Sequence, residues 1–397
     1  MAKILSSDSW QTRKLGEMAE EVRDLFEPRG AKEFPYVGLE HIDQGTLQLN
    51  SVGQSTDTVS TKKRFNRGEI LFGSLRPYFR KVVRPKFIGV CSTDITVIKP
   101  KKNCDAGFLQ YFIANQSFID HATNISSGTR MPRANWKTLC ESEWQFPSLP
   151  TQRKIAAILS AYDDLIESNL RRIKILEEMA QNLYREWFVK FRFLGHQQTR
   201  FNDSPLGKIP EGWWAVTVEQ IVERVPSGKK YDQKTVSTTG KVPVLDQGRS
   251  GTIGYHDDHP GVLASEAAPI IVFANHTCYQ RLIMFSFSAI QNVLPFLPNS
   301  EYPRNIYWLY YATKDLVTFN DYKGHWPEFM AKELIVPSSN NCQQFGDFVE
   351  PIIRLIFKME KRNTTLRRTR DLLLPRLISG EVDVSELDIA VPEEAIA

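Results

Sequence analysis

The stretch "LPTQRKIAAILSAYDDLIESN" (Leu149–Asn169) decides the fold, because it opens a long helix whose apolar residues follow heptad spacing. Counted from Ile155 in alternating steps of four and three, the series runs to Leu183, and a second series runs from Phe345 to Leu373. Such spacing is typical of coiled coils. The residues predicted to form the seam of one helix pair are Ile155, Leu159, Ile166, Asn169, Ile173, Leu176, Leu183, Phe345, Val349, Ile352, Ile356, Asn363, Leu366 and Leu373.

The two series belong to a repeat of the whole chain, since Ile155 and Phe345 lie 190 residues apart. "WQFPS" precedes the first helix and "LIVPS" the second, and "WQTRKLGEMAEEV" from Trp10 resembles "WWAVTVEQIVERV" from Trp213. One apolar stripe is also typical of a surface helix packing on its own domain, but two at matched positions favour pairing. We expect an α+β fold with pseudo-twofold symmetry, in which two mixed α/β domains alternate with two long helices packed as an antiparallel coiled coil.

The expected division has five parts: residues 1–148 a first globular domain, 149–193 a central helix, 194–338 a polar linker and second globular domain, 339–382 a C-terminal helix, and 383–397 an acidic tail that should fray. A buried Asn in each helix, Asn169 and Asn363, would fix the register of the pair. From Ile155 to Leu183 the helix rises about 42 Å at roughly 1.5 Å per residue. A spacer of that length exceeds one turn of DNA, about 34 to 36 Å.

The composition is that of a globular protein, with 42% hydrophobic residues, 24% charged residues and a mean hydropathy of -0.33. No apolar run approaches the roughly 18 residues of a membrane-spanning helix, and the first residues lack a signal-peptide core, so we expect a cytoplasmic protein. Five scattered cysteines without a C-x-x-C pair predict reduced thiols. The net charge of +4 is too small to indicate nucleic-acid binding, so the distribution of charge must decide.

Basic residues gather in one stretch, "TKKRFNRGEILFGSLRPYFRKVVRPK" (Thr61–Lys86), which holds nine cations and one acid and so carries a net charge of +8. Cationic side chains neutralise phosphates, and Arg also binds guanine edges. A solvated basic edge is the structural alternative. With a second loop, "SSGTRMPRANW", this stretch provides the DNA-binding candidates of the first domain, which are Lys62, Lys63, Arg64, Arg67, Arg76, Arg80, Lys81, Arg130 and Arg133.

The second domain has no comparable cluster, because seven basic and six acidic residues nearly balance between Glu223 and Arg281. Its DNA-binding candidates are therefore isolated ones in three loops, "SGKKYDQK", "DQGRSGTIGY" and "DYKGHWPEF". They are Lys229, Lys230, Arg249, Lys323 and His325.

The chain contains no catalytic motif that we recognise. It lacks the phosphate-binding G-x-x-x-x-G-K-[ST], the dinucleotide G-x-G-x-x-G and the nucleophile elbow G-x-S-x-G. The H-x-x-H spacing of His256 and His259 lies in a Gly-flanked turn without a further ligand, which predicts a solvated turn rather than a metal site. A recognition protein is favoured over two rivals, a nuclease or methyltransferase and a coiled-coil adaptor with no DNA role.

Two motifs resemble those of type I restriction-modification specificity subunits. The run from Pro147 to Asp163 resembles their P-x-L-P-x-Q-x-K-I-A-x-I-L signature at the start of the central conserved helix, and "LLPRLISGEV" (373–382) resembles the end of their C-terminal conserved helix. The resemblance implies two target recognition domains that each read half of a split double-stranded DNA sequence, held apart by an antiparallel helix pair. It also implies a non-catalytic chain without a cofactor or metal.

The partners implied by the resemblance are two modification subunits, which methylate adenine with S-adenosylmethionine, and restriction subunits that use ATP and Mg. The sequence departs from the family pattern in two places. The second helix opens with "SSNNCQQF", so Cys342 stands where the first helix has Gln152. The second domain lacks the "GEILFGSLRPYFRK" pattern, and its DNA-contacting residues are correspondingly less defined.

Overall fold

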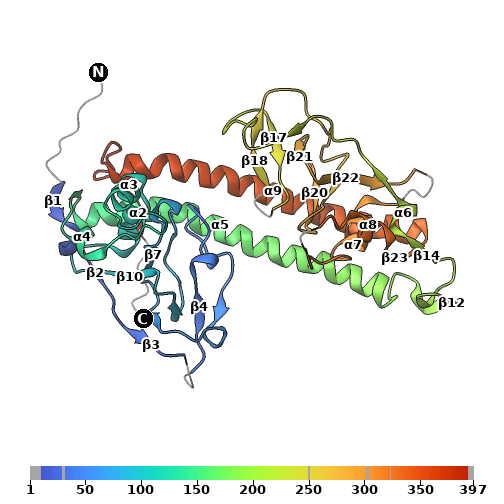
Figure 1. Ribbon diagram of the computed structural model, residues 1–397, viewed down its shortest axis with the longest axis horizontal. Coiled ribbons are helices and arrows are strands. Elements are labelled where there is room, and N and C mark those ends of the chain that lie inside the picture. Colours follow the sequence, from blue (N-terminus) through green and yellow to red (C-terminus); the bar gives the residue numbers. More distant parts are fainter. Residues whose placement is uncertain (1–9, 29–31, 249–250, 301–303, 322, 392–397) are drawn as a thin grey trace. The chain divides into compact units, whose positions relative to one another are not determined.

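Two long helices run through both structural units of the chain. The computed structural model describes residues 10–28, 32–248, 251–300, 304–321 and 323–391. Unit 1 comprises residues 1–168 and 362–397, and unit 2 comprises residues 169–361. Helix α5 (Leu149–Tyr184) and helix α9 (Ser339–Ile378), drawn in green and in orange to red in Figure 1, each contribute one half to each unit.

Unit 1 contains three sheets besides its part of the helix pair. Strands β1 (Gln11–Lys14) and β11 (Glu143–Phe146) form an antiparallel pair. The four-stranded sheet has the order β2 (Ala19–Glu21), β10 (Ile95–Pro100), β7 (Ile70–Gly73) and β8 (Val82–Val83). The five-stranded sheet has the order β3 (Leu25–Phe26), β6 (Lys62–Phe65), β9 (Gly89–Cys91), β4 (Pro35–Val37) and β5 (Gly53–Gln54). The helices between them are α1 (Leu15–Met18), α2 (Ala106–Ala114), α3 (Gln116–Asn124) and α4 (Trp136–Cys140), with short 3-10 turns η2 (Leu39–His41), η3 (Ser55–Asp57) and η4 (Pro77–Phe79).

Unit 2 repeats this plan. Strands β14 (Trp214–Thr217) and β23 (Glu333–Val336) pair as β1 and β11 do. Its first four-stranded sheet has the order β15 (Val222–Arg224), β22 (Val293–Pro298), β19 (Ile270–Ala274) and β20 (Gln280–Ile283), and the second has β16 (Lys230–Tyr231), β21 (Ser288–Ile290), β17 (Val242–Leu245) and β18 (Thr252–His256). The helices are α6 (Val218–Ile221), α7 (Ile306–Thr313) and α8 (Trp326–Ala331), and the hairpin β12 (Phe201–Ser204) and β13 (Gly207–Pro210) follows the 3-10 turn η6 (His196–Gln198).

The internal repeat predicted from the sequence is present in the main elements of both units. Leu15 and Val218, which the two Trp-led segments align, are the first residues of α1 and α6. Each of these short helices is preceded by a strand that pairs with the strand just before a long helix, and is followed by the edge strand of a four-stranded sheet. The predicted mixed α/β class is therefore confirmed, and each unit contains one copy of the repeat.

The halves of the long helices pack against each other inside each unit and run antiparallel there. In unit 1, Ile155 and Leu159 share a core with Leu374 and Leu377. In unit 2, Ala180 and residues of the short π-helix η5 (Arg185–Val189) share a core with Phe345 and Val349, and the ring centroids of Phe188 and Phe345 lie 5.1 Å apart. All fourteen predicted seam residues are buried or half-buried, including Asn169 and Asn363. Burial of these apolar rows stabilises the long helices. An isolated helix in water lacks this stabilisation.

An arginine occupies one heptad position of α9. Arg370 is 0% exposed, and its guanidinium donates to the Asp163 carboxylate of α5, to Asp371 at 3.0 Å and to the Thr46 carbonyl at 3.0 Å. Tyr111 of α2 donates to the other oxygen of Asp163 at 2.6 Å. Burial alone would lower the pKa of Arg370, but Asp163 and Asp371 raise it. We call these residues the Arg370 cluster. It joins both long helices to the domain around them.

The C-terminal tail was expected to fray, and for residues 383–391 this expectation is wrong. Val384 is buried in the core of unit 1, and Lys154 of α5 donates to the Ser385 carbonyl at 2.6 Å. Ile389 of the same segment is partly buried against that core. Residues 392–397 lie outside the described part of the chain.

Two other expectations concern the bulk chemistry of the chain. Cys91, Cys104 and Cys342 are buried free thiols, and burial raises the pKa of each to about 12, which keeps them protonated at neutral pH. Within the described residues, no helix is both long enough and apolar enough to cross a membrane.

The Arg370 cluster makes a direct prediction about stability. Replacing Arg370 by Met leaves the half-buried Asp163 carboxylate without its cation, so we expect the free energy of unfolding to fall by about 3 kcal/mol. The double variant Arg370→Met, Asp163→Leu removes both charges and should recover most of that loss. Urea denaturation of the purified chain, followed by circular dichroism, measures both. A loss below about 1 kcal/mol in the single variant would contradict a dry, paired cluster.

Candidate nucleic-acid interface

The first basic residues of the stretch Thr61–Lys86 make contacts within unit 1. Lys62 is buried and donates to the Ser60 carbonyl at 2.8 Å. Lys63 donates to the Ile95 carbonyl at 2.9 Å and lies 3.5 Å from a Glu21 carboxylate oxygen. The guanidinium of Arg64 lies over the rings of Phe26 and Phe34, at 5.6 and 5.4 Å from their centroids. These three side chains of β6 hold the domain together, and Lys62 is not accessible to a ligand in this conformation.

The C-terminal part of the stretch is anchored as well. Arg80 donates to the Ala114 carbonyl at 2.6 Å and lies 3.5 Å from Asp371 of the Arg370 cluster, and burial lowers its pKa. Lys81 donates to the Leu39 carbonyl. Among the described residues, Arg67 is the one predicted DNA-binding residue between 61 and 86 that is classed as exposed. A count of charges therefore overstates how much of this stretch is available to DNA.

A strained turn carries Arg76. The 3-10 turn η4 (Pro77–Phe79) lies between two residues in left-handed conformation, Arg76 with φ 51° and Arg80 with φ 50°. This conformation costs a side-chain-bearing residue roughly 1–2 kcal/mol, and such strain concentrates at functional sites. The Arg76 Nε atom is buried without a hydrogen-bond partner among the described atoms. Tyr78, at the tip of the turn, is 46% exposed.

Neighbouring loops hold this turn in place. The Arg76 N–H donates to the Pro132 carbonyl at 2.7 Å, and the Ser74 N–H donates to the Asp94 carbonyl at 2.9 Å. The Ser74 carbonyl in turn accepts from the Ala134 N–H at 3.0 Å. Three segments meet through these bonds, residues 74–81, 92–94 and 126–134. We call them the first loop cluster.

The first loop cluster presents cations and an aromatic ring together. Arg130 is exposed, and Arg133 is 57% exposed in its side chain and pairs with Asp94. An Nη atom of Arg76 donates to the Arg130 carbonyl at 3.4 Å. Guanidinium groups bind phosphates and guanine edges, and exposed aromatic rings stack on bases. Three of the predicted residues, Arg76, Arg130 and Arg133, are brought together here, whereas Lys62, Lys63 and Arg64 are not.

The predicted residues of unit 2 do not form one group. Lys229 is exposed and pairs with Asp258 at 3.0 Å, while burial lowers the pKa of its neighbour Lys230. Lys323 is exposed. His325 is fully buried, with its ring nitrogens 3.1 Å from the Asp321 carbonyl and 3.4 Å from Glu328, so its role in this conformation is structural. Arg249 lies outside the described residues.

The H-x-x-H segment is only partly the solvated turn that its sequence predicts. His256 is buried, stacks on Tyr231 with ring centroids 4.2 Å apart, and has Nε2 2.9 Å from the Ser288 hydroxyl. The apolar ring of Tyr231 covers it, which the glycines around the turn do not reveal. Within the described residues, no three His, Cys, Asp or Glu side chains are grouped to hold a metal ion.

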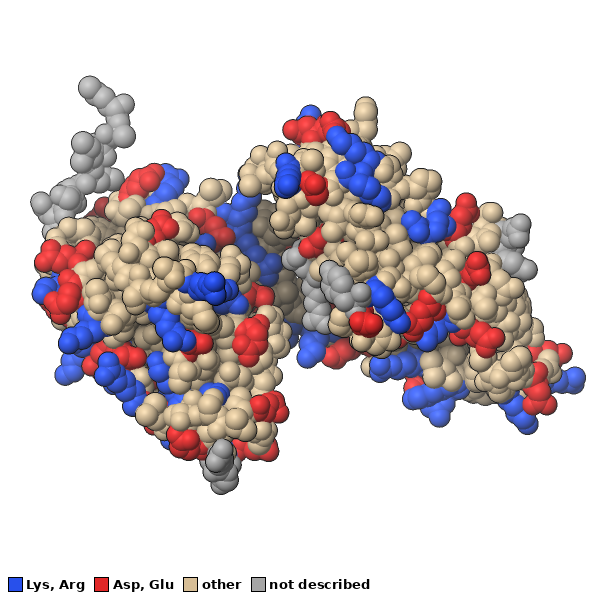
Figure 2. All heavy atoms as spheres, in the orientation of Figure 1, with Lys and Arg blue, Asp and Glu red and all other residues tan. Residues whose placement is uncertain are grey.

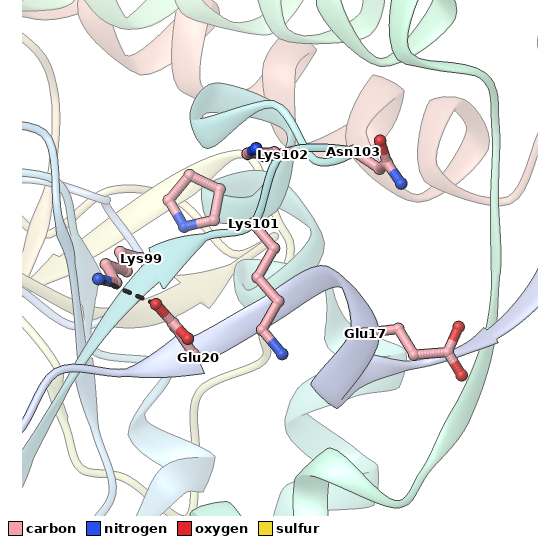
Figure 3. A pocket seen from close by; sticks show the side chains of 7 residues that line it. Glu17, Glu20, Lys99, Lys101, Lys102 and Asn103 are labelled. Carbon is pink, nitrogen blue, oxygen red and sulfur yellow. Dashed lines mark ion pairs between the residues drawn. The ribbon is translucent and has the colours of Figure 1, made fainter.

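The surface also carries a charged depression of about 480 Å³, lined by Glu17, Glu20 and residues 99–103 (Figure 3). Lys99 and Glu20 pair across it at 2.9 Å, and Lys99 lowers the pKa of Glu20. On the face drawn in Figure 2, basic and acidic side chains are likewise interspersed in both units. Opposite charges that lie this close weaken the field at a distance, so on this face local loops rather than a broad basic patch are the candidates for DNA contact.

Sequence reasoning missed Asp94, which orients Arg133, and did not single out Tyr78 as a contact. Asp94 stands in "CSTDIT", in the turn between β9 and β10, and its neighbour Ile95 pairs with Gly73 of β7, which brings Asp94 beside the loop that follows β7. That position, rather than its charge, is the signal that identifies it.

The strain at Arg76 makes a prediction about stability. Arg76→Gly and Arg76→Ala both remove the guanidinium, but only Gly adopts the left-handed conformation without steric cost. We expect the Gly variant to be more stable than the Ala variant by about 1 kcal/mol. Thermal unfolding of the two purified variants measures the difference. Equal stability, or a more stable Ala variant, would show that the turn is not strained.

Comparison with known proteins connects this architecture to one family. Residues 7–178 match the family model described as the type I restriction modification DNA specificity domain. The type I restriction enzyme MjaIX specificity subunit of Methanocaldococcus jannaschii is 27% identical over 352 residues, which cover 81% of this chain and 79% of that protein. The type I restriction enzyme EcoDI specificity subunit of Escherichia coli is 29% identical over 168 residues, covering 41% of this chain and 37% of that protein.

A solved structure has the same fold along most of its length. The S subunit of a type I restriction-modification system from M. genitalium matches with a TM-score of 0.55 and 17% identity, covering 94% of this chain and 97% of that one. With the family-model match and the named relatives, the resemblance carried by the two helix motifs is confirmed. Residues 7–178 thus match the DNA specificity domain of type I restriction-modification systems, and the chain is similar to specificity subunits of such systems along most of its length.

Proposed function

We propose that this chain gives a type I restriction-modification complex its DNA sequence specificity, with each recognition domain reading one half of a bipartite target. The observation that carries the proposal is the DNA specificity domain matched by residues 7–178, together with the second copy of the same fold in unit 2. The family is non-catalytic, and the chemistry then belongs to partner subunits.

In the first domain, the first loop cluster is the proposed contact surface. Arg76, Arg130 and Arg133 would bind phosphates or guanine edges, and Tyr78 would stack on a base. Arg67 is a further candidate for phosphate contact because it is exposed. Lys62, Lys63 and Arg80 support this surface from inside the domain. Binding by cations on loops should weaken steeply as salt rises.

The long helices are the proposed spacer. Helix α5 is continuous from Leu149 to Tyr184, and α9 from Ser339 to Ile378. Inside each unit their halves are held by buried seams, which makes a rigid element of the kind that could set the gap between half-sites. Several large apolar side chains of the two helices remain exposed, namely Leu165, Leu170, Ile175, Met179, Phe348, Leu355 and Leu372. These faces are where we expect two modification subunits to bind.

The division of the chain then follows the sequence, with recognition domains in residues 1–148 and 194–338, spacer helices in 149–193 and 339–382, and a tail in 383–397. Double-stranded DNA, the modification subunits and the restriction subunits are the proposed partners. S-adenosylmethionine, ATP and Mg would be bound by those subunits and not by this chain. We expect the complex to act in the cytoplasm, where chromosomal DNA is available.

A methylation map tests the function. We expect deletion of the gene in the source cell to abolish N6-methyladenine at one two-part motif with a fixed gap, because the modification subunits would lose their guide to the DNA. Sequencing that detects modified bases, with the gene intact and deleted, makes the measurement. An unchanged map, in cells shown to express the protein and active modification subunits, would favour the coiled-coil adaptor instead.

Lengthening the spacer tests its role. One heptad inserted into each long helix extends the pair by about 10 Å, which corresponds to about three base pairs. We expect the gap of the methylated motif to grow accordingly while both half-sites stay the same. A heptad in α5 alone serves as control, since it would break the pairing of Asp163 with Arg370 and should reduce methylation. Altered half-sites with an unchanged gap would contradict the spacer role.

A further inference from the structure

The second recognition domain has no basic cluster, so its contact surface must be located by another route. The first loop cluster lies at three defined positions of the repeated fold: directly after β7, in the turn between β9 and β10, and before the short helix α4. In unit 2 the equivalent positions follow β19, lie between β21 and β22, and precede α8. They comprise residues 275–279, residues 291–292 and the segment that ends at His325.

The same backbone hydrogen bonds join the loops in both units. The Asn275 N–H donates to the Asn292 carbonyl at 2.9 Å, as the Ser74 N–H donates to the Asp94 carbonyl at 2.9 Å. The Asn275 carbonyl accepts from the His325 N–H at 2.9 Å, as the Ser74 carbonyl accepts from the Ala134 N–H. These bonds depend on no particular side chain, so the arrangement persists where the sequences differ.

The loop after β19 is held still by further contacts. A Cβ atom at Gly324 would lie 2.9 Å from the Asn275 amide nitrogen, so the absence of a side chain there permits the close approach. Cys278, between β19 and β20, is in left-handed conformation with φ 57°. Arg76 and Arg80 have this conformation in the equivalent connection of unit 1, between β7 and β8. The Thr277 hydroxyl donates to the Gln247 carbonyl at 2.6 Å. An ordered loop recognises a ligand at a lower entropic cost than a mobile one.

The side chains of this loop suit the reading of base edges. The Gln247 Oε1 atom accepts from the His276 N–H at 2.9 Å, which fixes the amide orientation and leaves its Nε2 group as a donor. Thr277 is exposed, and Tyr279 is 36% exposed. Exposed Lys323 comes from the segment that precedes α8 and provides a cation for phosphate. Amide and hydroxyl groups discriminate bases, whereas cations mainly position the duplex.

We infer that the loop 275–279, with Gln247 and Lys323, is the surface by which the second domain reads its half-site, and that the Lys229–Lys230 turn is not. This inference rests on the proposed function. The turn is excluded because Lys229 pairs with Asp258 and Lys230 donates to the Ser227 hydroxyl. A count of charged residues would not have selected the loop 275–279.

The test compares two double variants of the full chain, expressed with its modification subunits. His276→Ala with Thr277→Ala alters the loop, and Lys229→Ala with Lys230→Ala is the matched control in the same domain. In a methylation map, we expect the first pair to lower the preference for the correct base at one half-site roughly tenfold, which is the effect of losing one base contact. The other half-site and the gap should stay unchanged. The control should keep the whole motif.

The outcomes separate the inference from the function on which it rests. Loss of preference in the Lys229 and Lys230 variant, with an unaltered motif in the loop variant, would overturn the inference while the specificity role stands. A methylated motif that survives deletion of the gene would overturn the function itself. If the loop variant abolishes all methylation through misfolding, the single variant Thr277→Val decides, and an unaltered second half-site in that variant would also overturn the inference.

Discussion

The pairing of buried Arg370 with Asp163 is the interaction on which unit 1 depends. Its cost is high, because a guanidinium and a carboxylate leave water together, and full hydrogen bonding is required to offset it. Each partner meets that requirement from a different element: Tyr111 from α2, Thr46 from a loop, and Asp371 from α9 itself. An apolar seam of the same volume could slide by a heptad, whereas this cluster has one register.

The same cluster reaches the candidate DNA surface. Asp371 also contacts Arg80, one of the two left-handed residues that flank the turn carrying Tyr78. The side chains of Asp371 and Arg80 therefore connect the helix seam directly to the first loop cluster. Because the Arg80 guanidinium contacts Asp371 and donates to the Ala114 carbonyl, its charge stabilises the shape of the turn. Positioning the turn and binding DNA are different tasks, and neighbouring arginines in one stretch divide them.

Much of the architecture could be predicted from the sequence, because heptad spacing and a repeat are properties of many residues at once. The same count placed Arg370 at a core position, although it could not identify Asp163 as its partner, since that pairing joins residues 207 apart. The candidate site was predicted less well. Lys62 and His325 carry the right chemistry but are buried, and the Asp94 turn carries no obvious signal. Burial and local pairing depend on tertiary structure, which a count of charges does not contain.

The division of the two long helices between the units also affects how the chain is made. Unit 2 is continuous in sequence, from residue 169 to 361, so all of it is available as soon as that stretch has left the ribosome. Unit 1 lacks Leu374, Leu377 and the partner of Asp163 until residues 362–397 are synthesised. At about 5–20 residues per second, the delay is roughly 10–40 s. During that interval the first half of α5 lacks its contacts with α9, so the domain that is translated first is the one that finishes folding last.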